Sequence, residues 1–348
     1  MELHVLDALR NLQVEVEFFA SKMRLPAAAP ALAQKVFTKI ANTWLREPEL
    51  RLERGLLSAV ERFAPEMILV ILGSQVSPKT IDRIRTRTSV PIVCWCQDSM
   101  TTLGRQYLLG SEYDAVFVKD RYFQDHLIQM LGSGRFHYLA EACNPRVHRT
   151  LELTEQDRAQ YGCDVTIAGS LYYYRQEMLQ ALEKEFEIKV WGAKPDWLAY
   201  RLHVRHMGRE ALGDEKVKAM TAARVALNSI HFSEVDGLNC RAFELAGCGA
   251  FQLCTARPVL AEHFVPGVEL ETFGSLAELI DKIRHFVGHP DQAAAIARRG
   301  QLRAHRDHTY ERRLEEIFSV VFAVRRPSTA AVHLPALPLE TVVAVERR

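Results

Sequence analysis

Short apolar runs alternate with longer stretches of mixed polarity along the first part of the chain. Residues 67–72, MILVIL, form a continuous apolar run of the kind that is buried on both faces of a parallel sheet. Similar runs occupy 91–96, 114–119 and 136–140, and the run VEVEFFA at 14–20 precedes them. Helices are predicted over 31–46, 49–63, 77–88 and 120–131. This alternation of strand and helix predicts a doubly wound α/β domain.

The same alternation begins again after the polar stretch LTEQDRAQYG. Strands are predicted over 164–169, 188–192, 223–229 and 250–254, and helices over 172–186, 240–247, 275–287, 290–303 and 308–323. The two series predict an α/β protein of two Rossmann-like domains that face a cleft, one over 1–150 and one over 151–323. Residues 324–348 contain several prolines among alanine, valine and threonine, and a disordered tail is expected there.

The composition is that of a globular protein with almost no net charge. The 348 residues include 44 Lys and Arg against 43 Asp and Glu, a formal charge of +1, which argues against a nucleic-acid partner. The longest aliphatic run, 67–72, is too short to be a transmembrane segment, and residues 1–20 lack the apolar core of a secretory signal. The seven cysteines are scattered and show no metal-ligand spacing. We therefore expect a reduced, cytoplasmic protein, and the sequence leaves its oligomeric state open, a homo-oligomer included.

The stretch 228–254 holds the richest set of polar groups. It predicts a strand, a loop, a short helix that begins after Asn239 and ends at Gly249, and a further strand. The N-terminus of that helix offers backbone N–H groups and a positive dipole to an anion such as a diphosphate. Arg241 in its first turn is unfavourable unless an anion is present, and Glu244 can accept two hydrogen bonds from a ribose diol. The alternative interpretation of these residues is an ordinary strand–helix–strand unit in which the acid and the base are solvated.

The pattern LN-x-R-x-FE-x-A-x-CGAF-x-L at 238–253 resembles the signature of the CgeB-like, or spore-maturation-type, glycosyltransferases. FVPGVELETFGSLAELIDKI at 264–283 and the closing segment 289–317, which includes His-Thr-Tyr, resemble the segments that follow the signature in that family. The resemblance extends in order over about residues 3–322. These enzymes are relatives of the group 1 glycosyltransferases. The resemblance therefore implies a GT-B fold and a hexosyltransferase-type reaction with a nucleotide-sugar donor.

The resemblance also implies roles on the donor side. Group 1 retaining enzymes carry two acidic residues eight positions apart, here Asp236, expected near the donor sugar, and Glu244, expected on the nucleotide ribose. Arg175 is the candidate cation for the leaving diphosphate, with Arg241 as the second cation. The other expected donor-binding residues are Gly169, Ser170, His231, Gly237, Leu238 and Asn239. The alternatives are a surface helix position for Arg175 and an ordinary satisfied polar group for His231.

On the acceptor side, Asp98 comes two residues after the end of the predicted strand 91–96, so its carboxylate is expected at the ligand edge of the sheet. There it can orient an acceptor hydroxyl or act as a general base. An Asx turn or a helix cap is the alternative. Gly73 and Ser74, which end the run 67–72, are expected to line the same side.

One departure from the family pattern concerns the start of the N-terminal domain. The family opens with an apolar strand and a glycine-rich loop, whereas ELHVLDALRNLQVEVEFFA at 2–20 resembles the helix and second strand that follow them. We therefore expect a domain that lacks its first strand. Such a loss would leave a core strand unpaired and weaken the case for catalysis.

The leading interpretation is a glycosyltransferase that moves a sugar from a nucleotide sugar to a protein, glycan, lipid or small molecule. The paired acids favour retention, and the lack of a D-x-D motif at a strand end favours chemistry without a metal or other cofactor. Two alternatives stay open. One is a non-catalytic sugar-nucleotide-binding or scaffold protein, and the other is an epimerase or hydrolase of nucleotide sugars.

Overall fold

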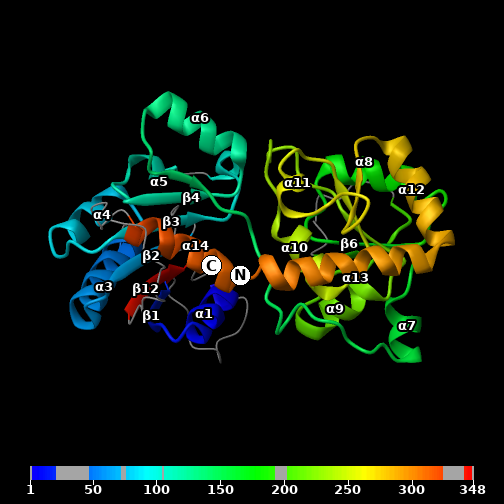
Figure 1. The fold of residues 1–348 in the computed structure, drawn as a ribbon, viewed down its shortest axis with the longest axis horizontal. Coiled ribbons are helices and arrows are strands. Elements are labelled where there is room, and N and C mark those ends of the chain that lie inside the picture. Colours follow the sequence, from blue (N-terminus) through cyan, green and yellow to red (C-terminus); the bar gives the residue numbers. More distant parts are fainter. Residues whose placement is uncertain are drawn as a thin grey trace, which may run out of the picture. The chain divides into compact units, whose positions relative to one another are not determined.

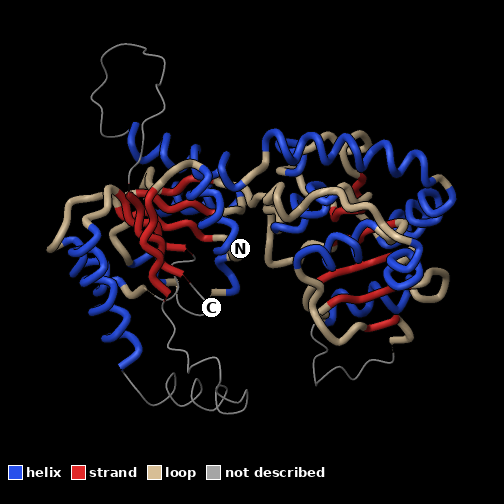
Figure 2. The backbone as a smooth tube through the Cα atoms, turned by 90° about the horizontal axis from the view of Figure 1, so that it is seen from below, coloured by secondary structure: helices blue, strands red, loops and turns tan. Residues whose placement is uncertain are grey.

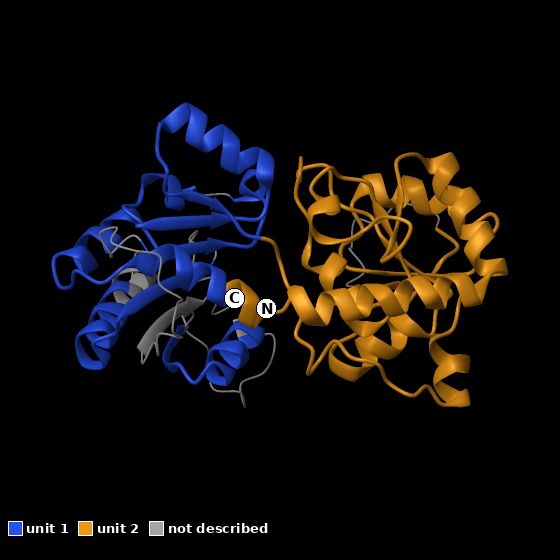
Figure 3. Ribbon diagram, viewed as in Figure 1, with its two compact units in different colours: residues 1–139, 314–348 blue, residues 140–313 orange. Residues whose placement is uncertain are grey.

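Two parallel α/β units make up the chain, as the repeated alternation of strands and helices predicts. The computed structural model describes residues 2–20, 47–71, 76–103, 106–192, 202–323 and 341–346. One unit consists of residues 1–139 and 314–348 and the other of residues 140–313 (Figure 3). Each unit is described by itself below. None of the helices in these described ranges is long and apolar enough to cross a membrane.

The sheet of the first unit has six parallel strands in the order β1-β12-β2-β3-β4-β5 (Figure 1). The strands are β1 (Glu15–Ala20), β2 (Met67–Ile71), β3 (Ile92–Cys96), β4 (Ala115–Val118), β5 (Phe136–Tyr138) and β12 (Thr341–Glu346). The helices are α1 (Glu2–Asn11), α3 (Glu47–Phe63), α4 (Pro78–Arg85), the 3-10 turn η1 (Met100–Thr102), α5 (Tyr107–Gly110), α6 (Arg121–Leu131) and most of α14 (Tyr310–Ala323). The predicted helix 31–46 lies outside the described residues.

Both faces of this sheet are buried, as the continuous apolar runs predict. Ile68 and Val70 pack in one cluster with side chains of α3, α4 and α6. Met67, Leu69 and Trp95 have the opposite parity in their strands, and they are buried too. Figure 2 shows helices packed against the strands of this unit. Burial on both faces explains why these strands are apolar throughout rather than alternating.

Strand β12 differs most from what the sequence predicts. It lies between β1 and β2, and Val342 stands opposite Val16 of β1 and Met67 of β2. The segment expected to be a disordered tail therefore contains a strand, and β2 has a neighbour on each side instead of an unpaired edge. The sequence TVVAVE is rich in β-branched residues, which favour strands, but the prolines before it dominated the prediction.

The sheet of the second unit is also six-stranded and parallel, in the order β11-β10-β9-β6-β7-β8. The strands are β6 (Val165–Ala168), β7 (Ile188–Trp191), β8 (Arg205–His206), β9 (Val225–Asn228), β10 (Gln252–Thr255) and β11 (Glu271–Phe273). The helices are α7 (Glu155–Tyr161), α8 (Tyr173–Leu182), α9 (Gly213–Thr221), α10 (Cys240–Cys248), α11 (Leu260–His263), α12 (Leu276–Gly288) and α13 (Pro290–Asp307).

Alternate residues of the central strands supply two separate cores in this unit. Val165 and Leu227 pack in a cluster with side chains of α8 and α12. Ala226 and Trp191 pack on the other face, in a cluster with side chains of α7 and α9. Figure 1 shows α8 and α12 above the sheet and α9 below it. Helices thus cover both faces and leave the carboxyl edge of the sheet to its loops.

The division between the units differs from the expected boundary near residue 150. Residues after Leu139 belong to the second unit because backbone hydrogen bonds tie them to its closing helices. The Cys143 amide donates to the His308 carbonyl (2.9 Å), and the Tyr310 amide donates to the Cys143 carbonyl (3.3 Å). Helix α14 then returns the chain to the first unit.

Five elements of the second unit were not predicted because they are short or polar: α7, β8, α9, α11 and β11. Helix α7 lies within LTEQDRAQYG and begins with a capping box of Thr154 and Asp157. Helix α9 is nine residues long and strand β11 is three. Each is too short for its hydrophobic period to stand out.

The position of β12 can be tested with a proline. Val343 lies in the middle of the strand, between two neighbours. Val343→Pro removes a backbone donor inside a sheet, where proline is not tolerated. We expect the unfolding transition of the first unit to fall by about 5 °C or more in calorimetry of the full chain. Val343→Ile, which keeps the donor, should unfold close to the wild type. If Val343→Pro unfolds at the same temperature as the wild type, β12 does not lie between β1 and β2.

Candidate functional site

The loops after β6 and β9 and the start of α10 belong to the carboxyl edge of the second sheet. Strands β6 and β9 are neighbours, so the residues that follow them, Gly169 and Ser229, begin at the same edge. Ligands of parallel α/β sheets bind outside this edge. Most of the residues predicted on the donor side therefore come from adjacent loops of one unit.

Arg175, in the first turn of α8, is a buried cation bonded to neutral oxygens. It is 4% exposed. Its Nε donates to Ser229 Oγ (2.8 Å), its Nη2 to the Ser229 carbonyl (2.9 Å) and its Nη1 to the Ser170 carbonyl (2.5 Å). Within the described ranges no carboxylate forms an ion pair with it. Burial and the positive charge of Arg241 lower the pKa of Arg175 to about 9. A buried guanidinium without a counter-ion favours a bound anion.

Arg241 brings a second guanidinium to the same place. A Cβ atom built on Gly169 would lie 2.5 Å from Arg241 Nη2 and 3.6 Å from Arg175 Nη1, so both cations lie over this glycine. Gly169 has φ +105°, which other residues rarely adopt, and any side chain there would displace Arg241. The side chain of Arg241 makes no hydrogen bond or ion pair with any residue that the structure describes. The structure therefore brings together the two cations that the sequence singled out.

Helix α10 begins and ends where the sequence predicts. Asn239 is its N-cap, and its Oδ1 accepts from the Ala242 amide (3.2 Å). The Asn239 side chain also pairs with that of Asn228 at the end of β9, through two bonds of 3.1 and 2.9 Å. Gly249 closes the helix in the left-handed conformation. The amide pair fixes the helix start against the strand, which in turn positions Arg241 in the first turn.

Glu244, one turn further along α10, is held ionised between two basic groups. Its Oε2 lies 2.6 Å from Lys216 Nζ, and its Oε1 lies 3.7 Å from His148 Nε2. His148 Nδ1 accepts from the Asn144 amide (3.0 Å), so a neutral ring carries its proton on Nε2, toward Glu244. Although burial opposes ionisation, Lys216 and His148 lower the pKa of Glu244 to about 2. Each carboxylate oxygen can still accept a further hydrogen bond.

The loop before α10 holds the other predicted acid. Asp236 Oδ1 accepts from the Val259 amide (2.9 Å), which ties the loop to the segment before α11. Gly237 and Leu238 are buried between Asp236 and the N-cap. This carboxylate thus has a structural bond, which the sequence did not predict.

His231 and Ser170 lie in the loops beside the two cations. Ser170 is exposed, and its carbonyl accepts from Arg175. His231 Nδ1 contacts Ser233 Oγ (2.7 Å) and accepts from the Ser233 amide (3.1 Å). Its ring centroid lies 4.5 Å from that of Tyr172. Both residues are therefore at the predicted edge of the second sheet.

The predicted acceptor-side residues belong to the first unit. Asp98 follows β3 at the carboxyl edge of its sheet, as predicted, and it is partly exposed. Gly73 and Ser74 lie outside the described residues.

Residues 175–319 match the family model described as glycosyl transferase-like. Sucrose-phosphate synthase from Thermosynechococcus elongatus superposes with a TM-score of 0.67 at 13% identity, over 92% of each chain. HepE of Anabaena, solved in complex with UDP-glucose, gives 0.61 at 13% identity, over 89% of this chain and 99% of that one. A glycosyltransferase from Rickettsia africae gives 0.62 at 10% identity, over 94% of each chain. No curated protein matches the sequence.

The chain has the GT-B glycosyltransferase fold. The likeness to solved structures covers both units, and the family match lies within residues 175–319, which include α8, α9 and α10. This confirms the prediction of two parallel-sheet α/β domains of the GT-B class. Arg175, Lys216, Arg241 and Glu244 all lie inside the family match.

Three residues of the candidate site were not predicted. Ser229 anchors Arg175, and Lys216 and His148 flank Glu244. Ser229 is the last residue of the predicted strand 223–229, so its position at the ligand edge could have been inferred from the sequence. Lys216 lies on α9, which was itself missed, and His148 comes from a loop distant in sequence, so no local pattern indicates either.

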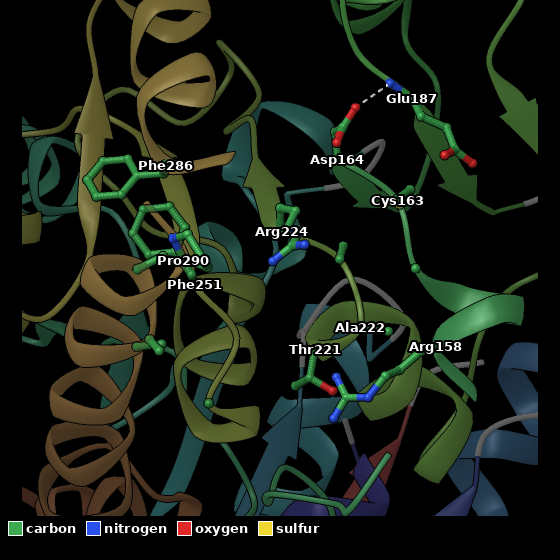
Figure 4. Close-up of a pocket in the computed structure, with 16 residues that line it drawn as sticks. Arg158, Cys163, Asp164, Glu187, Thr221, Ala222, Arg224, Phe251, Phe286 and Pro290 are labelled. Atoms are coloured by element: carbon green, nitrogen blue, oxygen red, sulfur yellow. Dashed lines mark hydrogen bonds between the residues drawn. The ribbon is translucent and has the colours of Figure 1, made fainter. Parts of the chain in front are cut away.

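A cavity of about 500 Å³ lies at the opposite edge of the same sheet. Asp164, Arg224 and Phe251 line it and stand just before β6, β9 and β10. Figure 4 shows Arg224 between Asp164 and the pair Phe251 and Phe286. Ligands of open parallel α/β sheets bind at the carboxyl edge, so this hollow is separate from the candidate site.

The ion pair of Lys216 with Glu244 can be tested by pH. Lys216→Met leaves Glu244 buried without its closest cation, so the pKa of Glu244 should rise and the free energy of unfolding at pH 7 should fall by about 3 kcal/mol. In the wild type the folded pKa lies below that of an unfolded glutamate. Its stabilisation is therefore complete above about pH 4.5 and is lost as the pH falls toward 2.

We therefore expect urea unfolding of Lys216→Met to depend less on pH between pH 5 and 3 than that of the wild type. Lys184→Met, which removes an exposed lysine, is the control and should follow the wild type. Parallel profiles for Lys216→Met and the wild type would mean that Lys216 does not control the ionisation of Glu244.

Proposed function

We propose that the second unit binds the diphosphate of a nucleotide sugar and that the chain is a glycosyltransferase. The observation that carries the proposal is the pair of guanidinium groups, Arg175 and Arg241, that meet over Gly169 without a carboxylate from the described part of the chain. Guanidinium groups bind phosphate oxygens through strong charge-assisted hydrogen bonds. The glycosyl transferase-like match over residues 175–319 supports the same assignment.

Glu244 is proposed to bind the nucleotide ribose. It is ionised, it lies one turn from Arg241 on the same helix, and a carboxylate accepts both hydroxyls of a diol. HepE, which shares the fold, was solved in complex with UDP-glucose, so a UDP-sugar is the donor to test first. Asn239 and the backbone of Gly237 and Leu238 are proposed to face the diphosphate or the sugar.

In the proposed reaction, an acceptor hydroxyl oxygen forms a bond to the anomeric carbon of the donor sugar. The bond from that carbon to the diphosphate oxygen breaks, and its electron pair stays on the diphosphate. Arg175 and Arg241 stabilise the charge that develops there, which allows the step to proceed without a metal ion. Asp98 orients the acceptor hydroxyl and takes its proton. Asp236 is assigned to the donor sugar. Retention at the anomeric carbon is part of the proposal, and it requires the acceptor oxygen to attack from the same face that the diphosphate leaves.

Finer assignments belong to this proposal as well. The signature at 238–253 supports a CgeB-like enzyme, and the resemblance supports transfer of a hexose. All seven cysteines are free thiols, which supports a reducing compartment such as the cytoplasm.

Arg241 tests the diphosphate assignment because its side chain holds no other described residue in place. Arg241→Met should raise the Kd for UDP-glucose in isothermal titration by roughly tenfold to a hundredfold, as expected for a lost charged hydrogen bond. The unliganded variant should be at least as stable as the wild type, because a like charge beside Arg175 is removed. Arg224→Met, an exposed arginine at the opposite edge of the sheet, is the matched control. Equal Kd values for Arg241→Met and the wild type would rule out the assignment.

Asp98 tests the acceptor side. Asp98→Asn keeps the size of the side chain but cannot take a proton at neutral pH. We expect release of UDP from UDP-glucose, with water or an added acceptor, to slow by about a hundredfold or more. The Kd for UDP-glucose should not change, and Asp82→Asn on an exposed face of α4 should behave as the wild type. If Asp98→Asn releases UDP as fast as the wild type, Asp98 is not the general base and serves only as a turn residue.

A further inference from the structure

An array of aromatic rings lies in the same loops as the cation pair. Tyr172, Tyr174, His231 and Phe232 form this aromatic array. Three of these residues are exposed: Tyr172 by 45%, Tyr174 by 46% and Phe232 by 68%. We propose that the aromatic array binds the acceptor and that this acceptor is a saccharide. The inference rests on the proposed function, since it names the acceptor of the same reaction.

Ring contacts join the members of the array into one surface. The His231 ring lies 4.5 Å from Tyr172 and 4.2 Å from Phe232, measured between centroids. Tyr174 meets the Phe232 ring edge-on at 6.3 Å. The tyrosines come from the start of α8 and the other two rings from the loop after β9, so two neighbouring strands position the array. Large rings left exposed in one contiguous patch indicate a binding surface.

The array is continuous with the proposed diphosphate site. The Arg175 guanidinium carbon lies 5.9 Å from the Tyr172 ring centroid. His231 touches Tyr172 on one side and Phe232 on the other, so the surface extends from the cation pair to Phe232 and Tyr174. The donor sugar is bonded directly to the diphosphate and is assigned to the Asp236 loop. A group held at the far end of the array is therefore assigned to the acceptor.

The chemistry of the array fits a saccharide better than a lipid chain. A pyranose has an apolar C–H face and hydroxyl groups at its rim, so it needs flat rings together with polar partners. Because His231 Nδ1 accepts from the Ser233 amide, a neutral ring carries its proton on Nε2, and burial lowers its pKa, which favours the neutral form. Phe232 supplies an apolar face, and tyrosine presents an apolar ring with a polar tip. A lipid chain would leave these polar groups unpaired.

The test compares labelled protein variants on a glycan microarray in the presence of UDP. We expect the wild type to bind one or more glycans and Phe232→Ala and Tyr174→Ala each to bind them about fivefold or more weakly. Tyr122→Ala is the matched control, because Tyr122 is an exposed tyrosine stacked on a histidine in the first unit. It should bind the same glycans as the wild type.

Titration with UDP-glucose separates this inference from the proposed function. The wild type and both array variants should bind UDP-glucose equally, because neither Tyr174 nor Phe232 forms a hydrogen bond with Arg175 or Arg241. A wild type that binds UDP-glucose but no glycan, or array variants that bind glycans as the wild type does, would overturn the saccharide platform alone. A wild type that does not bind UDP-glucose would overturn the proposed function. Transfer to a glycan that the wild type binds is a further check. If the array variants lower kcat but leave the KM for that glycan unchanged, the rings do not bind the acceptor and the inference is contradicted.

Discussion

Two like charges meet over Gly169, and much of the second unit is organised to hold them there. The backbone at Gly169 leaves room for Arg241, and three oxygens from Ser229 and Ser170 hold Arg175 in place without neutralising it. Burial and the like charge of Arg241 both oppose the positive charge of Arg175, and its lowered pKa reflects that cost. A bound polyanion removes the cost. The unliganded protein is therefore preorganised for the negative charge that it is proposed to bind.

The negative charge of the site, on Glu244, lies on the same helix as Arg241 but is kept apart from the two arginines. Glu244 stands one turn beyond Arg241, yet its carboxylate pairs with Lys216 and His148 rather than with the arginines. This separation leaves the cations for a diphosphate and the carboxylate for hydroxyl donors. Helix α10 can hold both because its start is fixed by the side-chain amide pair of Asn228 and Asn239. The aromatic array adds an apolar surface that begins at Arg175.

The sequence predicts what is local and periodic. The buried parallel strands, the cap at Asn239 and the stop at Gly249 follow from apolar runs and capping residues, and the structure has all of them. The meeting of Arg175 and Arg241 was proposed from a family resemblance, because no local pattern brings residues so far apart together. Lys216 and His148 were missed for the same reason. Strand β12 was missed because the prolines before it indicate a disordered tail and because its pairing partners, β1 and β2, lie at the other end of the sequence.

The most direct measurement is isothermal titration of the unmodified protein with UDP, UMP and uridine. If the two arginines bind a diphosphate, affinity should rise with each phosphate, and UDP should bind at least roughly a hundredfold more tightly than uridine. The difference should shrink as salt is added, because charged contacts are screened. Equal affinity for the three ligands, or no binding of UDP, would contradict the account.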